Sequence, residues 1–412
     1  MNLIRALALS LPLLMLSSNL FAATEFVSLL KSSGGDYSSV QTWESQMDNA
    51  GDITNANCKV FSHSGIFGSV WDNSVVTGET SGATGVTIHA TSRQILIDTI
   101  SGTFQSGERV KAGQSDFVIL TNVGDSAIIV GMIDGTLAGK TTIDGFTTSS
   151  TNYVKLTSAP WNRHQGTAST GSRMTFTTVS GFERTVIASN DYTLVEWLIF
   201  EPSIGHDHYT LRINANNVQF NNNILHPTSC TSTMQCHGIF NGGTFTGHSV
   251  SNNIIYEYNS NSLSGGIVTY STGTQNAYNN TVYDCDYNFH MSASGTPLIA
   301  KNNIAQGGDT ADYQGTYDGS STHNLSSDAT APGTINYRTK TVSFVSTSTD
   351  NYHLSSSDVE AYNLGTDTTT TANIDIDNFD RDTSGVTWDL GADERWTNTT
   401  INGATLNGAT IN

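Results

Sequence analysis

The sequence predicts an all-β protein built as a right-handed parallel β-helix, a solenoid of stacked coils with a short N-terminal helical cap. Two observations lead to this prediction: a repeat of apolar segments that carry paired asparagines, and a turn-rich composition dominated by Gly, Ser, Thr and Asn. Such a composition favours short strands separated by turns. A helical protein would be richer in Ala, Leu, Glu and Lys, and the recurring Val, Ile, Phe and Tyr runs argue against disorder.

The repeat is a pair of asparagines within an apolar segment. The pairs begin at Asn222, Asn252, Asn279 and Asn302, so successive pairs are 30, 27 and 23 residues apart. A second short apolar run lies between successive pairs, at 238–240, 266–268 and 288–289. A period of this length that contains two short strands is typical of a β-solenoid.

Stacking of the coils places equivalent residues above one another at about 4.8 Å. We therefore expect Ile224, Ile254, Thr281 and Ile304 to form one column. The asparagine side chains are expected to bond to one another from coil to coil, and Asn tolerates the left-handed backbone of a tight bend. The segment 192–199 is similar to an earlier copy that lacks the asparagine pair.

The chain divides into five predicted parts. The parts are a signal peptide at 1–23, a cap and first strand at 24–60, a β-helix at 61–345 with its clearest coils at 192–304, a closing segment at 346–396, and a five-residue-repeat tail at 397–412. The signal peptide is indicated by Arg5 before an apolar stretch and by the small residues Ala22 and Ala23 at the expected cleavage point. The mature protein is then exported and has no membrane span.

The predicted cap is a helix near residue 40. Val40, Trp43 and Met47 have helical spacing, and Ser38 or Ser39 supplies an N-cap. Such a cap would shield the first coil from water.

Four cysteines are present, and none forms a CxxC zinc motif. Export permits disulfides, and the first choice of pairing is Cys230 with Cys236. Cys285 is an alternative partner for either residue, and Cys58 is expected to be a buried free thiol.

The chain is acidic, with 36 Asp and Glu against 17 Lys and Arg and a net charge of −19. A surface of this charge repels nucleic acid and anionic lipid. It also repels acidic polysaccharides unless a cation such as Ca²⁺ bridges them. Solubility alone is the alternative explanation of the charge.

Three segments resemble secreted right-handed parallel β-helix repeat proteins of the pectin-lyase-like superfamily, most of them uncharacterised. The segments are the asparagine-pair coils 218–304, the stretch 323–333, and the closing sequences Asp-Asn-Phe-Asp-Arg at 377–381 and Trp-Asp-Leu-Gly-Ala-Asp-Glu at 388–394. The likeness spans roughly residues 142–394 and implies the fold. Enzymes of this superfamily act on polysaccharides as lyases, hydrolases or esterases, but one scaffold hosts many activities.

Of two catalytic signatures found in enzymes of this superfamily, one is absent from this chain and the other is incomplete. The adjacent Asp pair and Gly-His-Gly of polygalacturonase-type hydrolases are absent. Residues 35–41 resemble the start of pectin methylesterases, but the later catalytic motifs are missing. We therefore interpret residues 35–41 as cap and first strand only.

Lyase chemistry requires a base beside the substrate carboxylate and a cation that stabilises the enolate. His206, His208 and Arg212 form a cluster of ionisable groups at the entrance of a coil and are the first candidates, with Lys301 as a further one. The alternative is that these side chains only pack or solvate a turn.

Two carboxylates occupy equivalent positions on adjacent predicted coils. Glu257 and Asp284 each follow a tyrosine, so stacking would place them about 5 Å apart. That separation suits a retaining glycosidase pair or a Ca²⁺ site.

An acidic cluster precedes Gly385. It contains Asp375, Asp377, Asp380 and Asp382 and could bind Ca²⁺, although it lacks the spacing of an EF-hand loop. A structural role in closing the solenoid is the alternative.

We expect a protein that binds or cleaves an extracellular or cell-surface polysaccharide along one face, as a lyase or glycosidase would. The alternative is a non-catalytic surface, adhesive or structural β-solenoid. A groove with clustered ionisable groups around Arg212, Glu257 or Lys301 would favour the enzyme. The regular Thr-x-Thr array of an ice-binding face is absent from the coils.

Overall fold

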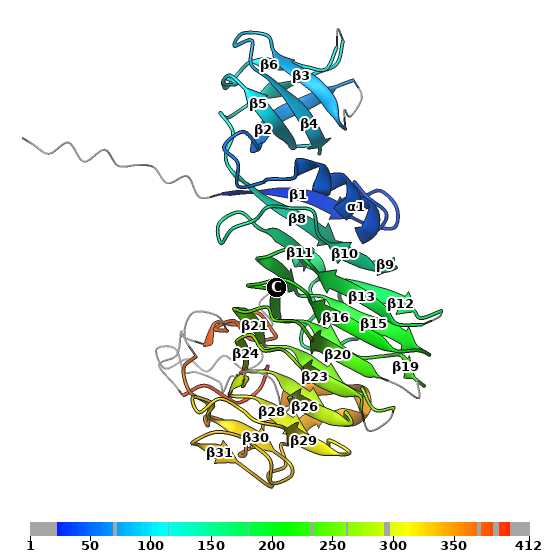
Figure 1. The fold of residues 1–412 in the computed structure, drawn as a ribbon, viewed down its shortest axis with the longest axis vertical. Helices are drawn as coiled ribbons and strands as arrows, with labels where there is room; N and C mark the ends of the chain where they lie inside the picture. Colours follow the sequence, from blue (N-terminus) through cyan, green and yellow to red (C-terminus); the bar gives the residue numbers. More distant parts are fainter. Residues whose placement is uncertain are drawn as a thin grey trace, which may run out of the picture.

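Short parallel strands stack into three sheets that run along the molecule and enclose a common core (Figure 1). The computed structural model describes residues 23–68, 72–113, 115–179, 181–231, 235–260, 263–291, 297–368, 372–381 and 387–395. The expected signal peptide through residue 22 and the whole repeat tail lie outside these ranges. The predicted fold class, an all-β parallel solenoid, is confirmed.

The three sheets have eight, ten and seven strands. The eight-stranded sheet contains β1 (Thr24–Leu30), β8 (Ala127–Ile133), β11 (Val154–Ser158), β14 (Thr193–Glu196), β17 (Gln219–Asn221), β21 (His248–Ser251), β24 (Gln275–Tyr278) and β27 (Ile299–Lys301). The ten-stranded sheet contains β9 (Thr136–Ala138), β12 (Arg173–Thr177), β15 (Ile199–Ile204), β18 (Ile224–Leu225), β19 (Ser229–Cys230), β22 (Ile254–Tyr256), β25 (Thr281–Tyr283), β28 (Ile304–Gln306), β30 (Asn324–Ser326) and β31 (Asn336–Tyr337). The seven-stranded sheet contains β10 (Thr141–Ile143), β13 (Glu183–Ala188), β16 (His208–Ile213), β20 (Cys236–Asn241), β23 (Gly265–Thr269), β26 (Tyr287–Met291) and β29 (Ala311–Gln314).

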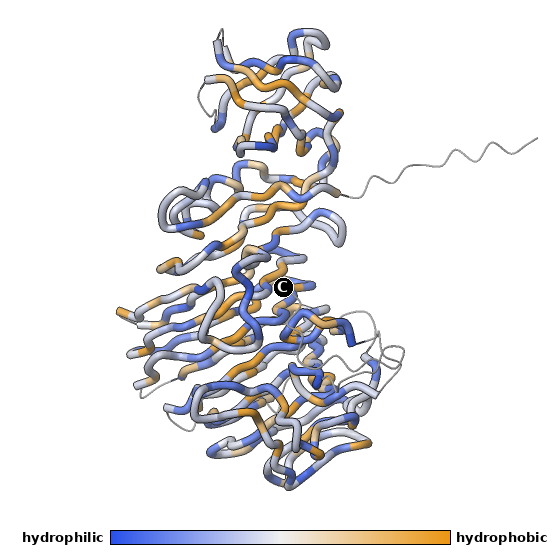
Figure 2. The backbone as a smooth tube through the Cα atoms, turned by 180° about the vertical axis from the view of Figure 1, so that it is seen from behind, coloured by the Kyte–Doolittle hydropathy of each residue, from blue (hydrophilic) through white to orange (hydrophobic). Residues whose placement is uncertain are grey.

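Side chains at equivalent positions form columns through the core. In the seven-stranded sheet, Leu211, Ile239, Ile267 and Phe289 are paired in register from coil to coil and are fully or almost fully buried. Figure 2 shows that hydrophobic residues concentrate along the strands of the stack. Burial of this continuous column stabilises coils that could not bury an apolar face singly.

The predicted asparagine ladder is present, and it is formed by the second asparagine of each pair. The side-chain Nδ2 groups each donate to the Oδ1 atom on the next coil at 3.0–3.2 Å, through Asn223, Asn253, Asn280, Asn303 and Asn324. All five side chains are fully buried. The ladder therefore satisfies buried amides at the bend between the eight- and ten-stranded sheets.

The first asparagine of each pair has a different role. Asn222, Asn252, Asn279 and Asn302 have φ between +53° and +57°, as expected for a tight bend. Their amides point away from the ladder and donate to backbone carbonyls of residues 366–375 at the C-terminal end of the chain. These asparagines thus attach the closing segment to the side of the solenoid.

The column that begins at Ile224 also faces the closing segment. Ile224, Ile254, Thr281 and Ile304 are in register as predicted. Because side chains alternate along a strand, the neighbouring Leu225 column enters the core and the Ile224 column points outward. The outward isoleucines are buried by Tyr352, Ile376 and other residues that follow the coils.

The expectation that the solenoid begins at residue 61 needs correction. Residues 59–120 form a closed antiparallel barrel with its own core, inserted between β1 and β8. Its strands are β2 (Lys59–Phe67), β3 (Ser74–Gly78), β4 (Thr84–Ala90), β5 (Gln94–Ser101), β6 (Arg109–Lys111) and β7 (Phe117–Leu120). The links between β3 and β4, between β4 and β5, and between β6 and β7 are too short for the crossover that parallel pairing requires, so these strands form hairpins.

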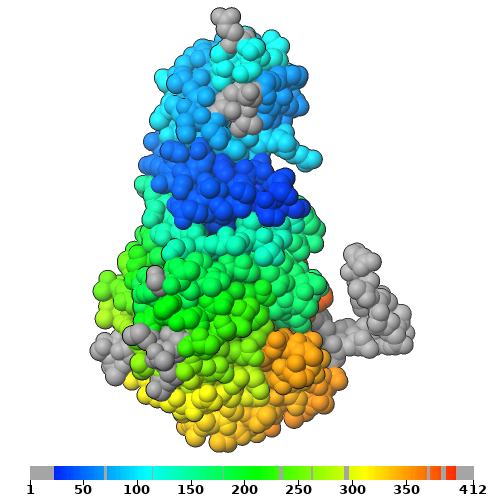
Figure 3. Space-filling view, turned by 90° about the vertical axis from the view of Figure 1, so that its right-hand side faces the viewer, coloured from blue at the N-terminus to red at the C-terminus, as the bar shows by residue number. Residues whose placement is uncertain are grey.

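The predicted cap helix is α1 (Val40–Met47), which lies between the barrel and the coils (Figure 3). Ser39 is the N-cap, and its Oγ accepts a hydrogen bond from the Thr42 amide at 3.1 Å. Trp43 is fully buried and packs on β8, where a Cβ at Gly131 would lie only 3.0 Å from the indole. A 3₁₀ turn, η1 (Asp48–Ala50), ends the cap.

The last strand of the solenoid is β31, and the chain then folds back along the coils. A hairpin of β32 (Phe344–Ser346) and β33 (Asn351–Leu354) contains the 3₁₀ turn η3 (Thr347–Thr349). The remaining 3₁₀ turn among the described residues, η2 (Pro160–Asn162), follows β11 in the coils. Residues 372–381 and 387–395 complete the closing segment. Its buried Arg381 pairs with Glu394 at 2.7 Å and donates to two backbone carbonyls.

Candidate functional site

The outer surface of the seven-stranded sheet carries a row of aromatic and basic side chains. The outward column that neighbours the core column consists of Ile187, Arg212, Phe240, Val268, His290 and Gln314. Strand alternation separates this column from the interior, and the cluster of Tyr209, Phe240 and Val268 is distinct from the main core. We call the rings of this surface the aromatic face: Phe182, Tyr209, His237, Phe240, Tyr270, Tyr287 and His290.

The rings of the aromatic face contact one another across successive coils. Tyr209 stacks on Phe240 with centroids 3.9 Å apart and on His237 at 5.0 Å, and the edge of Phe182 meets it at 4.6 Å. Phe240 continues the row to Tyr270 at 5.6 Å. The row ends with Tyr270, Tyr287 and His290, which contact one another through the imidazole. Tyr209, His237 and Phe240 are buried, so the rings that a sugar can reach are Phe182, Tyr270, Tyr287 and His290.

Two arginines lie at the start of this row without a counter-charge. The Arg184 guanidinium lies 4.5 Å from the Phe182 centroid and 5.7 Å from that of Tyr209. Burial and the neighbouring Arg212 lower the pKa of Arg184. Neither arginine forms an ion pair with a carboxylate among the described residues, and the Nε of each is buried without a hydrogen-bond partner. The pair is thus a local positive charge on an acidic protein.

A cavity of about 250 Å³ opens beside the arginine pair. Its walls are Gln41 of α1, residues 140–142 at β10, and Phe182, Glu183, Arg184 and Ile187 at β13. Lys140 adds a third cation, and its Nζ lies 3.1 Å from Glu183 Oε1. Glu183 is itself nearly buried and accepts a hydrogen bond from the Val179 amide at 2.8 Å. The cavity therefore presents the Arg184 guanidinium, the Lys140–Glu183 ion pair and threonine hydroxyl groups to a polar ligand.

The histidines of the aromatic face are held neutral by burial. His237 is fully buried, and neither ring nitrogen has a hydrogen-bond partner in the part of the chain that the structure describes. Burial, followed by the nearby His290, lowers the pKa of His237 to about 3. Burial also lowers the pKa of His290, and its Nδ1 has no partner. Because His237 is fully buried, only the half-buried His290 can exchange hydrogen bonds with hydroxyl groups of a ligand.

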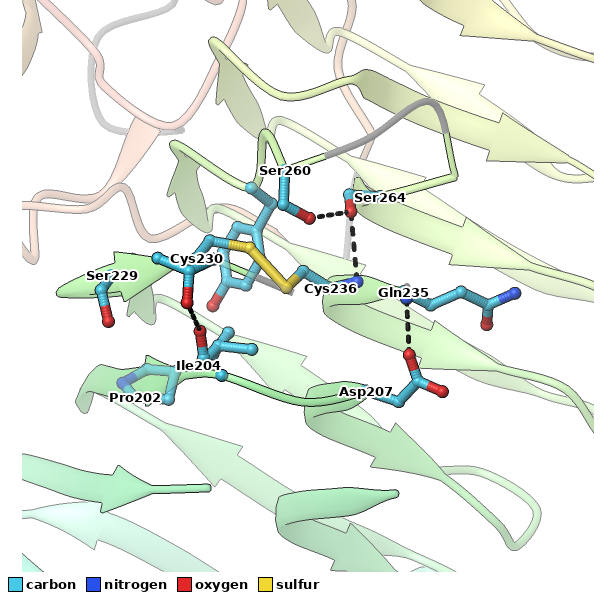
Figure 4. Close-up of a disulfide and its surroundings, with 12 residues drawn as sticks. Pro202, Ile204, Asp207, Ser229, Cys230, Gln235, Cys236, Ser260 and Ser264 are labelled. Carbon is cyan, nitrogen blue, oxygen red and sulfur yellow. Dashed lines mark hydrogen bonds between the residues drawn. A yellow bond between two sulfur atoms is a disulfide. The ribbon is translucent and has the colours of Figure 1, made fainter. Parts of the chain in front are cut away.

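The disulfide holds the start of β20 next to this face (Figure 4). Cys230 and Cys236 are bonded, so the first choice of pairing is confirmed. The adjacent Gln235 amide donates to Asp207 Oδ1 at 2.7 Å, and its side-chain oxygen accepts from the Tyr209 hydroxyl at 3.0 Å. Cys58 and Cys285 are buried free thiols. The disulfide thus fixes the strand from which His237 and Phe240 project.

The first three catalytic candidates are separated by the fold. Arg212 lies on the outer surface beside Arg184. His208 is fully buried, with Nε2 3.1 Å from Thr185 Oγ1, and burial lowers its pKa to about 3. His206 is exposed in the turn before β16. Only Arg212 among them lies in the outward column beside the aromatic face.

Glu257 and Asp284 occupy equivalent positions on adjacent coils, as expected from their tyrosines. Tyr256 and Tyr283 are paired in register, and both carboxylates follow at positive φ. Burial raises the pKa of Glu257, and Asp350 and Asp284 raise it further. Burial also raises the pKa of Asp284. The pair follows the last residues of β22 and β25 in the ten-stranded sheet, near Asp350 of the closing hairpin rather than in the row of Arg212.

Lys301 and the acidic cluster lie on other surfaces. Lys301 is on β27 of the eight-stranded sheet, 5.8 Å from the Tyr278 centroid. Asp375 is fully buried and accepts hydrogen bonds from the amides of Asp377, Phe379 and Glu394, so its oxygens close a turn. Asp382 lies outside the described residues.

Sequence reasoning missed the partners of Arg212. Arg184 is 28 positions earlier and the aromatic rings come from five separate strands or turns, so no local motif joins them. The available signal was the repeat itself, because Arg184 and Tyr209 are paired across coils. Extension of the register one coil towards the N-terminus would have found both residues.

The sequence matches no known protein-family model and no curated protein. Among the described residues, no helix is both long and apolar enough to cross a membrane. The fold and the geometry of the side chains therefore carry the functional argument.

Proposed function

We propose that this is an exported protein that binds an acidic polysaccharide along the aromatic face. The carrying observation is the Arg184–Arg212 pair, which has no carboxylate partner among the described residues although the chain has a net charge of −19. Guanidinium groups bind carboxylates and sulfates through paired hydrogen bonds. The overall charge repels an acidic chain, so local cations are needed to hold it without a bridging Ca²⁺.

The aromatic rings supply the second half of the recognition. They continue from Phe182 to His290 across several coils. An extended polysaccharide could thus contact arginines at one end and rings along the rest of the face. The resemblance of the coils and closing sequences to the pectin-lyase-like superfamily supports the same class of ligand.

Cleavage by β-elimination is a second candidate function. A base would take the proton from the carbon beside a uronate carboxylate, the bond to the glycosidic oxygen would break, that oxygen would take up a proton and leave as a hydroxyl group, and an unsaturated sugar would remain. Arg212 and Arg184 would hold the carboxylate and stabilise the negative charge that develops on it. A purely structural or adhesive solenoid is the alternative that the experiment must separate.

The test is binding of polyuronate, sulfated and neutral polysaccharides to the mature protein, with and without Ca²⁺. We expect Arg212→Ala and Arg184→Ala each to weaken polyuronate binding about 10- to 100-fold, because a charge-assisted contact contributes about 1.5–3 kcal/mol. Arg93→Ala removes the same charge from an exposed site and should leave binding within about twofold.

New reducing ends and the absorbance of unsaturated products are followed in the same mixtures. Binding without products supports the binding function and excludes the lyase. Equal binding of neutral and acidic chains, or full retention in both arginine variants, would remove the arginine pair from the site. No binding to any polysaccharide would favour the structural or adhesive solenoid.

A further inference from the structure

Three potential metal ligands meet where the closing hairpin contacts the closing segment. His353 of β33, Asp377 and Asp393 each offer one atom, and these atoms lie within 4.8 Å of one another. His353 Nε2 is 3.0 Å from Asp377 Oδ1. The ten-stranded sheet underlies this part of the chain, so the group is separate from the aromatic face.

His353 is oriented by a neighbour outside the group. Its Nδ1 lies 2.6 Å from the side-chain oxygen of Asn351, which can only accept a hydrogen bond. Nδ1 therefore carries a proton and Nε2 is directed at the two aspartates. Histidines that bind metals are commonly oriented in this way, by a hydrogen bond from the second ring nitrogen.

Asp393 is the most buried carboxylate of the group. It is only 6 % exposed, and one oxygen accepts a hydrogen bond from the Leu354 amide at 2.7 Å. His353 is its main positive neighbour, and Arg381 is already occupied by Glu394 and by backbone carbonyls. Two carboxylates therefore share one imidazole, and a bound cation would balance the excess negative charge.

Gly166 closes the remaining side of the group. Its φ is +68°, and a Cβ built there would lie 2.2 Å from His353 Nε2 and 2.8 Å from Asp377 Oδ1. Any larger residue would occupy the space next to the two ligand atoms. Glycine at this position keeps that space free for something the size of an ion.

We propose that His353, Asp377 and Asp393 bind one divalent transition-metal ion, for which Zn²⁺ is the probe. An imidazole with two carboxylates suits Zn²⁺ better than Ca²⁺, which prefers oxygen ligands alone. The ion would join the closing hairpin, the closing segment and the turn at Gly166. This proposal replaces the earlier set of aspartates, of which only Asp377 is retained, and it does not depend on polysaccharide binding.

The experiment is a titration of the chelator-treated full-length mature protein with Zn²⁺ and Ca²⁺ in the absence of polysaccharide. Calorimetry should give one Zn²⁺ per chain, and the thermal unfolding midpoint should rise with added Zn²⁺. His353→Gln and Asp377→Asn should each weaken Zn²⁺ binding at least 10-fold. His206→Gln is the matched control, because it removes an exposed histidine elsewhere and should change nothing.

A fold check accompanies each variant. Circular dichroism and the metal-free unfolding midpoint show whether His353→Gln and Asp377→Asn retain the native structure. Asn351→Ala keeps all three ligands and should weaken binding by a smaller factor if His353 is oriented as described. The proposal is overturned if Zn²⁺ does not bind, if Ca²⁺ binds in its place, or if folded His353 and Asp377 variants bind Zn²⁺ as the native protein does.

Discussion

Removal of one rung from the asparagine ladder gives a strong test of the fold. The Asn253 side chain makes four hydrogen bonds: Oδ1 accepts from the backbone amide and Nδ2 of Asn223, and Nδ2 donates to Phe220 O and Asn280 Oδ1. In Asn253→Ala, the Asn223 backbone amide loses its partner in a fully buried place. The other three partners, Asn223 Nδ2, Phe220 O and Asn280 Oδ1, each lose one hydrogen bond.

The expected cost follows from these contacts. One buried amide without a partner costs about 1–3 kcal/mol, and each further lost hydrogen bond costs about 1 kcal/mol net. Asn253→Ala should therefore lower the free energy of unfolding by about 4–6 kcal/mol. This is a large fraction of the stability of an ordinary domain.

Urea unfolding followed by circular dichroism and by tryptophan fluorescence measures this change. Gln219→Ala is the matched control, since Gln219 is an exposed amide on the adjacent β17 and its loss should cost less than about 0.5 kcal/mol. A loss below about 1 kcal/mol for Asn253→Ala, or equal losses for both variants, would refute the argument that buried amide bonding holds the coils together.

Three further predictions concern the cap, the disulfide and the closing segment. Burial raises the pKa of Glu44 in α1 to about 7 from 4.5. The folded state therefore gains stability from the protonated carboxyl at low pH, and this stability is lost as the pH rises from 4.5 through 7. Glu44→Gln should flatten the fall of the thermal unfolding midpoint between these two pH values. Replacement of Cys230 and Cys236 by alanine opens a loop with a sequence separation of 6 and should cost about 2 kcal/mol in urea unfolding, whereas an unchanged midpoint would contradict it. Arg381→Met leaves the buried Glu394 unpaired and should cost about 3–5 kcal/mol, seen as faster proteolysis of the closing segment, and adding Glu394→Gln should restore most of the resistance.

The coils, the cap helix and the disulfide could be predicted because each leaves a local or periodic signal. The Asn222 and Asn252 pairs repeat with the coil, and Ser39 with Trp43 marks the helix within a few residues. The direction of each column was harder to predict. A shift of one residue moves a side chain from the core to the outside, which is why the Ile224 column proved to face the closing segment.

The barrel was not predicted because short apolar strands have similar sequences whether they pair in parallel or antiparallel. Strands such as Gln94–Ser101 carry a short run of apolar residues, as solenoid strands do. Only the lengths of the connections distinguish them: β4 ends at Ala90 and β5 begins at Gln94, which allows a hairpin but no coil. Attention to connection length would have separated 59–120 from the coils.

The candidate site was predicted through one residue only. Arg212 was identified from its ionisable neighbours His206 and His208, but those neighbours point elsewhere. The residues that do lie near it are Tyr209, on the same strand, and Arg184, on the previous coil. The register between the two strands brings them together. Sites on a solenoid are defined across coils, so sequence neighbours are a poor guide to them.

The attachment of the closing segment has a consequence for how this protein can evolve. Many solenoids gain or lose whole repeats with little effect, because each repeat contacts only its neighbours. Here one amide from each of four consecutive coils, Asn222, Asn252, Asn279 and Asn302, binds a fixed stretch of the returning chain. Deletion or duplication of a coil between them would make the returning chain too long or too short to bind all four asparagines. The length of the returning chain therefore restricts changes in the number of coils.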